Sequence, residues 1–256
     1  TCFSPDGEYI AAGMFGAIVM LPLYLQVVKG DTATEAGLKL IPFMLGIVST
    51  SIYSGKAITK HGHYKRFPII GTVVMTIGIL LMSTLSTTTP FWQLSSYAIL
   101  VGAGLGLSMQ TIVIALQNSV DFKDMGVATS SNTFFRSLGS VFGTAIFGSI
   151  LTNRVVHYMS SGFGDLAKTN PSALEGFDTS KLAALTNNTA VLKTFPPVIK
   201  QTALEAFVNS FHVVFYAAAP ITLLGLALAF MLRETPLRTT QDYAAAREDA
   251  AGESLG

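Results

Sequence analysis

The chain has 256 residues, of which half are hydrophobic and only 12 % are charged, and its formal net charge at pH 7 is +1. Soluble domains usually carry about 25 % charged residues, so this composition is typical of an integral membrane protein. The balanced charge, without a basic or acidic tract, excludes the electrostatic surface on which nucleic-acid binding depends.

Six apolar stretches are each long enough to cross a bilayer as a helix, which takes about 20 residues. In chain order they cover about 9–28, 37–57, 67–86, 92–117, 127–151 and 210–232. We therefore predict an all-α integral membrane fold, a bundle of six transmembrane helices within residues 1–233. The chain begins at Thr1 without an initiator methionine, and we interpret it as a segment of a longer protein.

Only the gap before the last stretch is long. It covers about 152–209 and contains two short amphipathic stretches, near 172–186 and 197–209, so we expect partly ordered surface structure there. Residues 234–256 are polar and alanine-rich without apolar periodicity, which predicts a disordered tail.

Lysine and arginine gather in the loops at one end of the predicted bundle. They are Lys60, Lys65 and Arg66 between the second and third stretches, Lys123 between the fourth and fifth, and Arg233, Arg238 and Arg247 in the tail. The short loops at the other end contain a single basic residue of this kind, Lys29. By the positive-inside rule both ends of the chain are cytoplasmic, the 152–209 loop is extracytoplasmic, and the protein is a multi-pass component of a plasma or bacterial inner membrane.

One arginine, Arg136, lies near the middle of the fifth stretch. A charge at that depth costs between about 3 and about 15 kcal/mol, so it needs a partner or a water-filled cavity. At 100° per residue its face of the helix also carries Thr129, Asn132, Thr133, Gly139, Ser140 and Gly143. This face is either a packing seam, with Gly139 and Gly143 as a GxxxG motif, or the lining of a polar cavity.

The fourth stretch repeats this arrangement. Its common face carries Gly102, Gly106, Gln110, Val113 and Gln117. Gln117 or Asn118 is a candidate acceptor for Arg136, and Gln110, deeper in the span, is a candidate substrate contact. Because no aspartate or glutamate lies within a predicted span, a membrane-embedded proton carrier of that type is not encoded in this chain.

No pattern predicts a catalytic site, a metal site or a cofactor. The pair His61 and His63 lies in a basic loop without a nearby carboxylate or cysteine, and the single cysteine, Cys2, excludes an internal disulfide. GAGLG at 102–106 lies inside a span and lacks the strand that precedes a dinucleotide-binding loop. We therefore expect a protein that is not an enzyme.

Five blocks of sequence carry a resemblance to a known family. They are LPLYLQVVKG at 21–30, AGLKLIPFMLG at 36–46, SGKAITKHGHYKRFPIIG at 54–71, GAGLGLSMQTIVIALQNSV at 102–120 and GVATSSNTFFRSLGSVFGTAIFG at 126–148. Together they resemble the major facilitator superfamily, and more narrowly its EmrB/QacA-type drug:proton antiporters with fourteen spans, in their bacterial form. The resemblance covers roughly residues 9–233 and implies that the chain is the C-terminal half, with the last six spans. It also implies that Arg136 is a feature of this bundle.

The third block resembles the cytoplasmic gate motif of the superfamily, in which a tight turn between two helices presents basic residues to the partner half. The resemblance implies gate-loop roles for Gly55, Lys60, Gly62, Lys65 and Arg66. The chain departs from the motif because Thr59 stands where an acidic residue is usual and Lys60 where arginine is usual.

The resemblance implies a proton-coupled secondary transporter that exports lipophilic or cationic drugs, with the substrate held between two six-helix bundles. The implied partners are the lipid bilayer, the missing N-terminal bundle, a small lipophilic or cationic substrate and protons, and no nucleic acid. One alternative is an exporter of an endogenous metabolite on the same fold. Another is a non-transporting membrane scaffold or sensor that uses the 152–209 loop as its binding surface.

Overall fold

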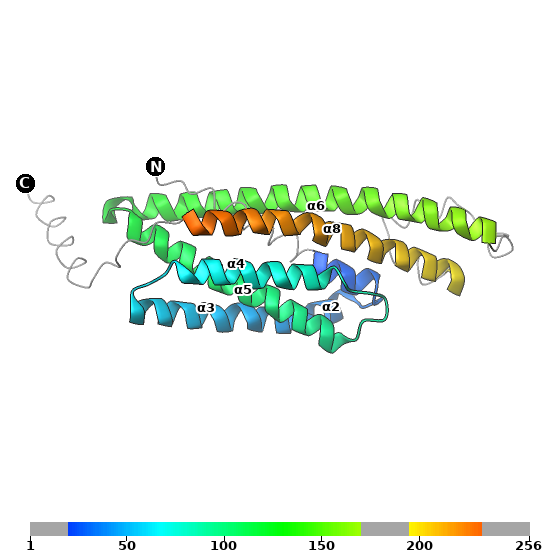
Figure 1. The fold of residues 1–256 in the computed structure, drawn as a ribbon, viewed down its shortest axis with the longest axis horizontal. Helices are drawn as coiled ribbons and strands as arrows, with labels where there is room; N and C mark the ends of the chain where they lie inside the picture. The colour runs from blue at the N-terminus through cyan, green and yellow to red at the C-terminus, as the bar shows by residue number, and fades with distance from the viewer. Residues whose placement is uncertain (1–19, 170–194, 232–256) are drawn as a thin grey trace, which may run out of the picture.

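The computed structural model describes residues 20–169 and 195–231, and every regular element in these ranges is helical. After a helical segment at 20–27 come α2 (Ala33–Lys39), α3 (Ile41–His61), α4 (Arg66–Met82), α5 (Phe91–Ser119), the 3-10 turn η1 (Phe122–Asp124), α6 (Met125–Thr169) and α8 (Pro197–Met231). The long helices run side by side in an elongated bundle (Figure 1). The prediction of an all-α fold is confirmed.

Four helical segments of the described ranges are long and apolar enough to cross a membrane. They are α2 and α3 taken together, α5, α6 and α8. α4 is equally apolar but has only 17 residues. Most of the predicted first span, the stretch near 172–186 and the tail at 234–256 lie outside the described residues, so the number of six spans stays a prediction.

The helix predicted over 37–57 is broken at Leu40 into α2 and α3. α2 begins with a capping box, in which Thr32 Oγ1 accepts a hydrogen bond from the amide of Glu35 and the Glu35 carboxylate accepts one from the amide of Thr32. Pro42 then lies in the first turn of α3, where its missing N–H does no harm. The same proline cannot donate back into α2, so the chain starts a new helix instead of continuing the old one.

α6 and α8 continue well beyond the apolar stretches that predict them. They have 45 and 35 residues, which correspond to about 68 Å and about 53 Å, whereas the hydrocarbon core of a bilayer is about 30 Å thick. The gap over 152–209, predicted to be partly ordered, therefore begins and ends in helix, and the predicted amphipathic stretch near 197–209 forms the start of α8. Figure 1 shows these two helices extending together past the ends of α3, α4 and α5.

A buried apolar row explains why the two extensions are helical. On α6 it recurs every fourth residue, and it packs in one hydrophobic cluster with small and apolar side chains of α8. The members are Leu151, Val155, Met159 and Phe163 on α6 and Ile199, Ala203 and Ala206 on α8. Because only one residue in four belongs to the row, the average hydropathy falls while the helix continues. A search for apolar spans therefore ends too early.

α5 packs between α3 and α4 through glycines on two of its faces. A side chain at Gly102 or Gly106 would overlap the carbonyl oxygens of Phe43 and Ile47 on α3, and one at Gly104 would overlap the backbone of Gly71 on α4. Only glycine lets the helix backbones approach so closely. The glycines of the fourth predicted span are therefore a packing seam.

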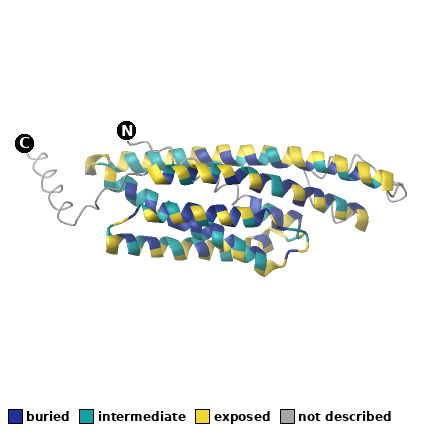
Figure 2. Cartoon of the chain, viewed as in Figure 1, coloured by how far each residue is buried: buried dark blue, intermediate teal, exposed yellow. Residues whose placement is uncertain are grey.

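Hydroxyl groups add hydrogen bonds between the same helices. Thr50 Oγ1 lies 3.0 Å from the carbonyl oxygen of Ala103, and Ser51 Oγ lies 3.2 Å from that of Gly106, so both connect α3 to α5. Thr76 Oγ1 donates to Thr222 Oγ1 at 3.0 Å and connects α4 to α8. Such bonds between membrane helices contribute about 0.6 to 2 kcal/mol each. Figure 2 shows the buried residues on the helix sides that face one another.

Replacing Gly104 with alanine should lower the stability of the bundle by about 1–3 kcal/mol, because the added Cβ meets backbone atoms of Gly71 and Met75 that cannot move aside. Thermal unfolding of the purified protein in detergent measures the effect. Gly148→Ala on α6 is the control, since nothing lies within 4 Å of the added atom. A Gly104→Ala variant that unfolds at the same temperature as the unmodified protein would contradict the packing argument.

Candidate functional site

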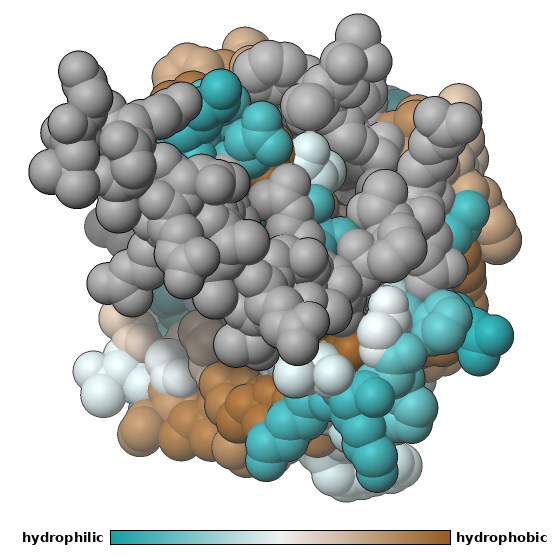
Figure 3. All heavy atoms as spheres, turned by 90° about the vertical axis from the view of Figure 1, so that its left-hand side faces the viewer, coloured by the Kyte–Doolittle hydropathy of each residue, from teal (hydrophilic) through white to brown (hydrophobic). Residues whose placement is uncertain are grey.

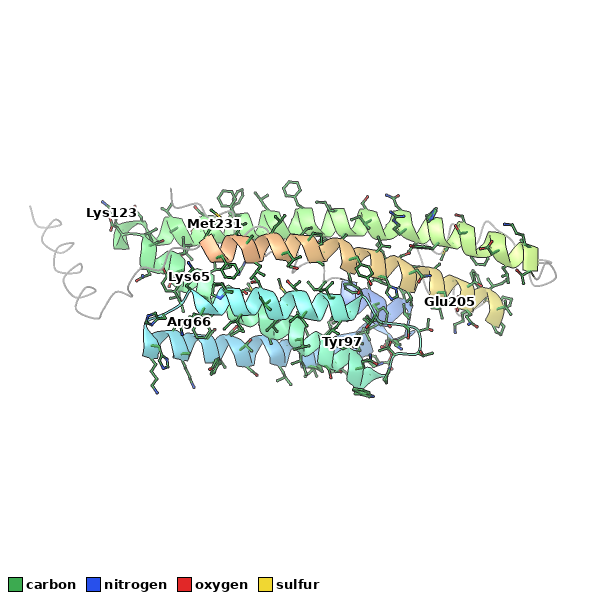
Figure 4. All side chains as sticks on the ribbon, viewed as in Figure 1. Lys65, Arg66, Tyr97, Lys123, Glu205 and Met231 are labelled. Atoms are coloured by element: carbon green, nitrogen blue, oxygen red, sulfur yellow. The ribbon has the colours of Figure 1, made fainter. Side chains whose placement is uncertain are left out.

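The two basic turns of the described chain lie at one end of the bundle, as predicted, whereas Arg233, Arg238 and Arg247 of the tail lie outside the described residues. The turn between α3 and α4 covers 62–65, and the turn between α5 and α6 contains η1. Figure 4 shows Lys65, Arg66 and Lys123 at this end, together with Met231, the last described residue of α8. Figure 3 views the molecule from this end, where the visible described surface carries hydrophilic patches and hydrophobic surface lies along the flanks.

The turn at 62–65 is held rigidly from both sides. Gly62 ends α3 in the left-handed conformation, with φ +73°, and its N–H donates to the carbonyl oxygen of Ile58 at 2.8 Å. Tyr64, which is only 2 % exposed, packs against Ile58 and against Ala115 of α5. The turn is therefore fixed by a buried aromatic ring as well as by its glycine.

Three basic side chains in and beside this turn have no carboxylate partner among the residues that the structure describes. Lys60 and Arg66 are exposed and Lys65 is half-buried. None of the three takes part in the ion pairs found among the described residues, which are Lys39 with Asp31 and Lys168 with Asp165. The structure thus presents the predicted gate-loop cations without a carboxylate partner in the described part of the chain.

The two histidines beside this turn bond to the backbone. His61 Nδ1 lies 3.0 Å from the carbonyl oxygen of Ala57, and His63 Nδ1 lies 2.7 Å from that of His61. Within residues 20–169 and 195–231, no group of three or more His, Cys, Asp or Glu side chains is placed to hold a metal ion.

A second group of predicted residues lies on the face shared by α3 and α5. Gln110 of α5 is exposed and stands over Gly55 of α3, with its Cγ 3.9 Å from where a Cβ of residue 55 would be. Gln117, two turns further along α5, is half-buried. Neither amide makes a hydrogen bond within the described ranges, so both can bond to a ligand or to another helix. The sequence assigned Gly55 to the gate and Gln110 to the cavity, whereas the structure places them together.

The fifth predicted span has two different sides in α6. Gly139 and Gly143 are buried and Asn132 is half-buried, whereas Phe134 and Phe142 are 59 % and 63 % exposed. The glycine side therefore faces into the bundle and the aromatic side faces outward.

Arg136 lies half-buried on α6 and has no hydrogen bond or ion pair with any residue that the structure describes. The predicted bond from Arg136 to Gln117 or Asn118 is not formed. The reason is the way the helices pack. α6 packs mainly on α8, whereas α5 packs mainly between α3 and α4, so α5 and α6 share few contacts. The guanidinium of Arg136 is thus available to a group outside the described residues.

The sequence did not predict a charged cluster at the opposite end of the bundle. Lys29 Nζ donates to the carbonyl oxygens of Thr87 and Thr89 at 2.8 Å and 2.7 Å. Lys39 Nζ lies 2.7 Å from both carboxylate oxygens of Asp31. Burial lowers the pKa of Lys29, the charge of Lys39 lowers it further, and the charge of Asp31 partly offsets these effects. In the sequence, the one feature that pointed to this cluster was the position of Lys29 as the single basic residue of a short polar loop.

The sequence is similar to those of known proteins. The profile of the Major Facilitator Superfamily matches residues 9–144. An uncharacterized MFS-type transporter of Mycobacterium tuberculosis strain H37Rv is 35 % identical over 247 residues, which cover 96 % of this chain and 34 % of the relative. The multidrug transporter protein MdtP of Bacillus subtilis is 32 % identical over 249 residues, covering 90 % of this chain and 45 % of the relative.

A tetracycline resistance determinant of Streptomyces rimosus is 29 % identical over 261 residues, which cover 96 % of this chain and 75 % of the relative. The chain spans about a third of the length of the Mycobacterium relative and less than half that of MdtP. The similarity to each of these relatives extends over nearly the whole chain.

Replacing Tyr64 with alanine should release the turn at 62–65, because it removes a buried ring and leaves a cavity, a change that costs about 3–5 kcal/mol for large aromatic residues. Limited trypsin digestion followed by mass spectrometry should show cleavage after Lys65 and Arg66 at least tenfold faster than in the unmodified protein. Tyr53→Ala is the matched control, since Tyr53 is 65 % exposed. Equal cleavage rates in all three proteins would show that Tyr64 does not anchor the turn.

Proposed function

Because the chain belongs to the Major Facilitator Superfamily, we propose that it is one helix bundle of a multidrug efflux transporter that exports small lipophilic or cationic compounds. Its apolar helices make it a multi-pass membrane protein, and its family consists of transporters, not enzymes. The main support for drug export is the similarity to MdtP over 90 % of the chain. The similarity to the tetracycline resistance determinant of S. rimosus supports the same function.

The proposal includes a second bundle. The chain corresponds to 34 % and 45 % of two of its relatives, which leaves room in those proteins for at least as many further helices. Apolar residues on α3 are exposed in the described structure, among them Met44, Val48 and Ile52 at 52–54 %. They need lipid or another helix bundle to cover them. In our proposal this chain is the C-terminal half of a fourteen-span transporter of the EmrB/QacA type.

We assign the end with the basic turns to the cytoplasm. Lys60, Lys65, Arg66 and Lys123 lie at that end, and the positive-inside rule places short basic loops on the cytoplasmic side of a plasma or bacterial inner membrane. Both ends of the chain are then cytoplasmic, and the extensions of α6 and α8 project on the outer side. The gate-loop cations face the part of the cytoplasm where the second bundle would meet them.

The substrate wall that we propose consists of the polar residues near the middle of the bundle. Transporters of this kind hold their substrate near the membrane midplane between two bundles. Gln110 stands over Gly55, where the absence of a side chain leaves room beside the amide, and Gln117 continues the same face. Asn132 and Arg136 of α6 supply further polar groups, and Gly106, Gly139 and Gly143 set how closely the helices of this wall pack.

Proton coupling in this proposal depends on the second bundle. No carboxylate lies in a predicted span of this chain, and a membrane-embedded aspartate or glutamate is the usual proton carrier. In this proposal the guanidinium of Arg136 stabilises a carboxylate of the partner bundle in its ionised form.

Dye efflux tests the proposed function. Cells that lack their own pumps would express the chain alone or together with the region encoded before it, and loss of ethidium would be followed with and without a protonophore. We expect protonophore-sensitive efflux only when both parts are present. Absence of efflux from a correctly inserted full-length protein would reject drug export and favour an endogenous metabolite as the substrate, which a metabolite screen can identify.

Replacing Arg136 with leucine should reduce efflux at least tenfold without preventing membrane insertion, because a partly buried arginine without a partner among residues 20–169 and 195–231 is available for the interaction that we propose with the second bundle. Initial efflux rates, normalised to the amount of protein in the membrane, measure the effect. Arg136→Lys should keep part of the activity, and Val141→Leu on the exposed side should keep all of it. Full efflux by the Arg136→Leu variant would show that Arg136 is not part of the proposed site.

A further inference from the structure

The segment between α4 and α5 is held by side chains from separate parts of the chain. Four of its backbone carbonyl oxygens accept hydrogen bonds: Leu85 from His212 Nε2 at 2.5 Å, Ser86 from the hydroxyl of Tyr24 at 2.8 Å, and Thr87 and Thr89 from Lys29 Nζ at 2.8 Å and 2.7 Å. We call this set the carbonyl clasp. It joins the helical segment 20–27, the loop after it and α8 to the end of α4.

Each bond of the clasp meets a need of the backbone. Carbonyl groups in a turn after a helix end have no partner within the helix and require one elsewhere when they are partly buried. Because a carbonyl oxygen can only accept, the Nε2 atom of His212 carries the hydrogen in this contact. The ammonium of Lys29 supplies two charge-assisted bonds at once, which are stronger than bonds between neutral groups.

The charge of Lys29 is compensated mainly by these carbonyl dipoles. Asp31 is a carboxylate whose charge acts on Lys29, but both of its oxygens are already 2.7 Å from Lys39 Nζ. Lys39 also lies 5.8 Å from the centre of the Phe91 ring, at the start of α5. The other titratable groups of the clasp, Tyr24 and His212, bond to neighbouring carbonyls and bring no negative charge. Lys29 therefore depends on Thr87 and Thr89 to stay ionised while half-buried.

We propose that Lys29 is a positioning residue of the transport cycle, because its ammonium fixes the end of the first predicted span to the α4–α5 segment so that these elements rock as one body. The inference rests on the proposed function. Rocking of a bundle transmits motion only if its helices do not slip against each other. Near this end, contacts of the 20–27 segment include the ring of Tyr24 against Phe211 of α8, with centroids 5.6 Å apart, and the bonds of the clasp.

Loss of the Lys29 charge at alkaline pH gives a further way to test the proposal. Burial lowers its pKa below the ordinary 10.5, so the ammonium loses its proton at a pH where an ordinary lysine still keeps it. The neutral amine has one donor fewer and no charge, and its two carbonyl bonds weaken. An arginine at the same position stays charged throughout this range.

Hydrogen exchange tests the clasp without any transport. Amide exchange would be measured by mass spectrometry on the purified chain in lipid nanodiscs, for the unmodified protein, Lys29→Met, Lys29→Arg and, as the control, the exposed Lys200→Met. We expect the amides of 83–89 to exchange at least tenfold faster in Lys29→Met than in the unmodified protein, and at the unmodified rate in the other two variants. Exchange at the unmodified rate in Lys29→Met would overturn the clasp.

Efflux by the full-length transporter tests the positioning role. Lys29→Met should lower the maximal rate at least fivefold with an unchanged KM, and Lys29→Arg should restore it. With rising pH, the rate of the unmodified protein should fall relative to that of Lys29→Arg. Faster exchange with unchanged turnover would make Lys29 merely structural and overturn the role. If no variant, including the unmodified protein, transports dye, the proposed function and the transport role fail together, while the exchange result still decides the clasp.

Discussion

The hydrocarbon of a bilayer offers no hydrogen-bond partner to a peptide group, and the rest of this structure depends on that constraint. Every backbone N–H and C=O within a span has to be satisfied inside the protein, which leaves the helix as the available form for a chain of this kind. Side-chain hydroxyls obey the same rule. Thr72, Ser108 and Thr111 each donate to the carbonyl four residues earlier in their own helix. Within residues 20–169 and 195–231, irregular backbone occurs only where helices end.

The same constraint decides how the helices hold together. Lipid is as apolar as leucine, so burial of apolar side chains does not by itself favour contact between helices, and close backbone packing takes its place. Gly102, Gly104 and Gly106 place α5 against both α3 and α4, and α8 joins this unit through the Thr76 and Thr222 hydroxyls. α6 is attached differently, through its row of apolar side chains against α8. The molecule thus combines a tightly packed unit with a longer helix pair.

The two ends of the bundle have opposite chemical characters, which agrees with the proposed movement against a second bundle. At one end, the turn at 62–65 is rigid but its cations have no partner among the described residues, so it presents charge to another body. At the other end, Lys29, Asp31 and Lys39 all have hydrogen-bond or ion-pair partners within the bundle. The end with the turn at 62–65 can therefore contact another body, whereas the end with Lys29 holds the helices of the bundle together.

The sequence by itself determined the class of fold and much of the helix framework, because hydropathy, prolines and loop charges are local properties. α5 occupies 91–119 where the sequence predicts 92–117, and the basic turns lie together as their charges indicate. It did not determine the break at Leu40, because the apolar pattern runs through Pro42 without interruption. It also did not determine the full length of α6, because the extension of that helix keeps only one buried apolar residue in four.

Only the tertiary structure decided which faces meet. It placed Gln110 over Gly55, formed no hydrogen bond between Arg136 and Gln117, and brought Lys29 to the carbonyls of Thr87 and Thr89. Helical periodicity gives the residues on a face but not the helix that the face will contact. A backbone carbonyl, moreover, is the same at every position of the sequence, so the partner of a buried donor becomes known only when the chain has folded.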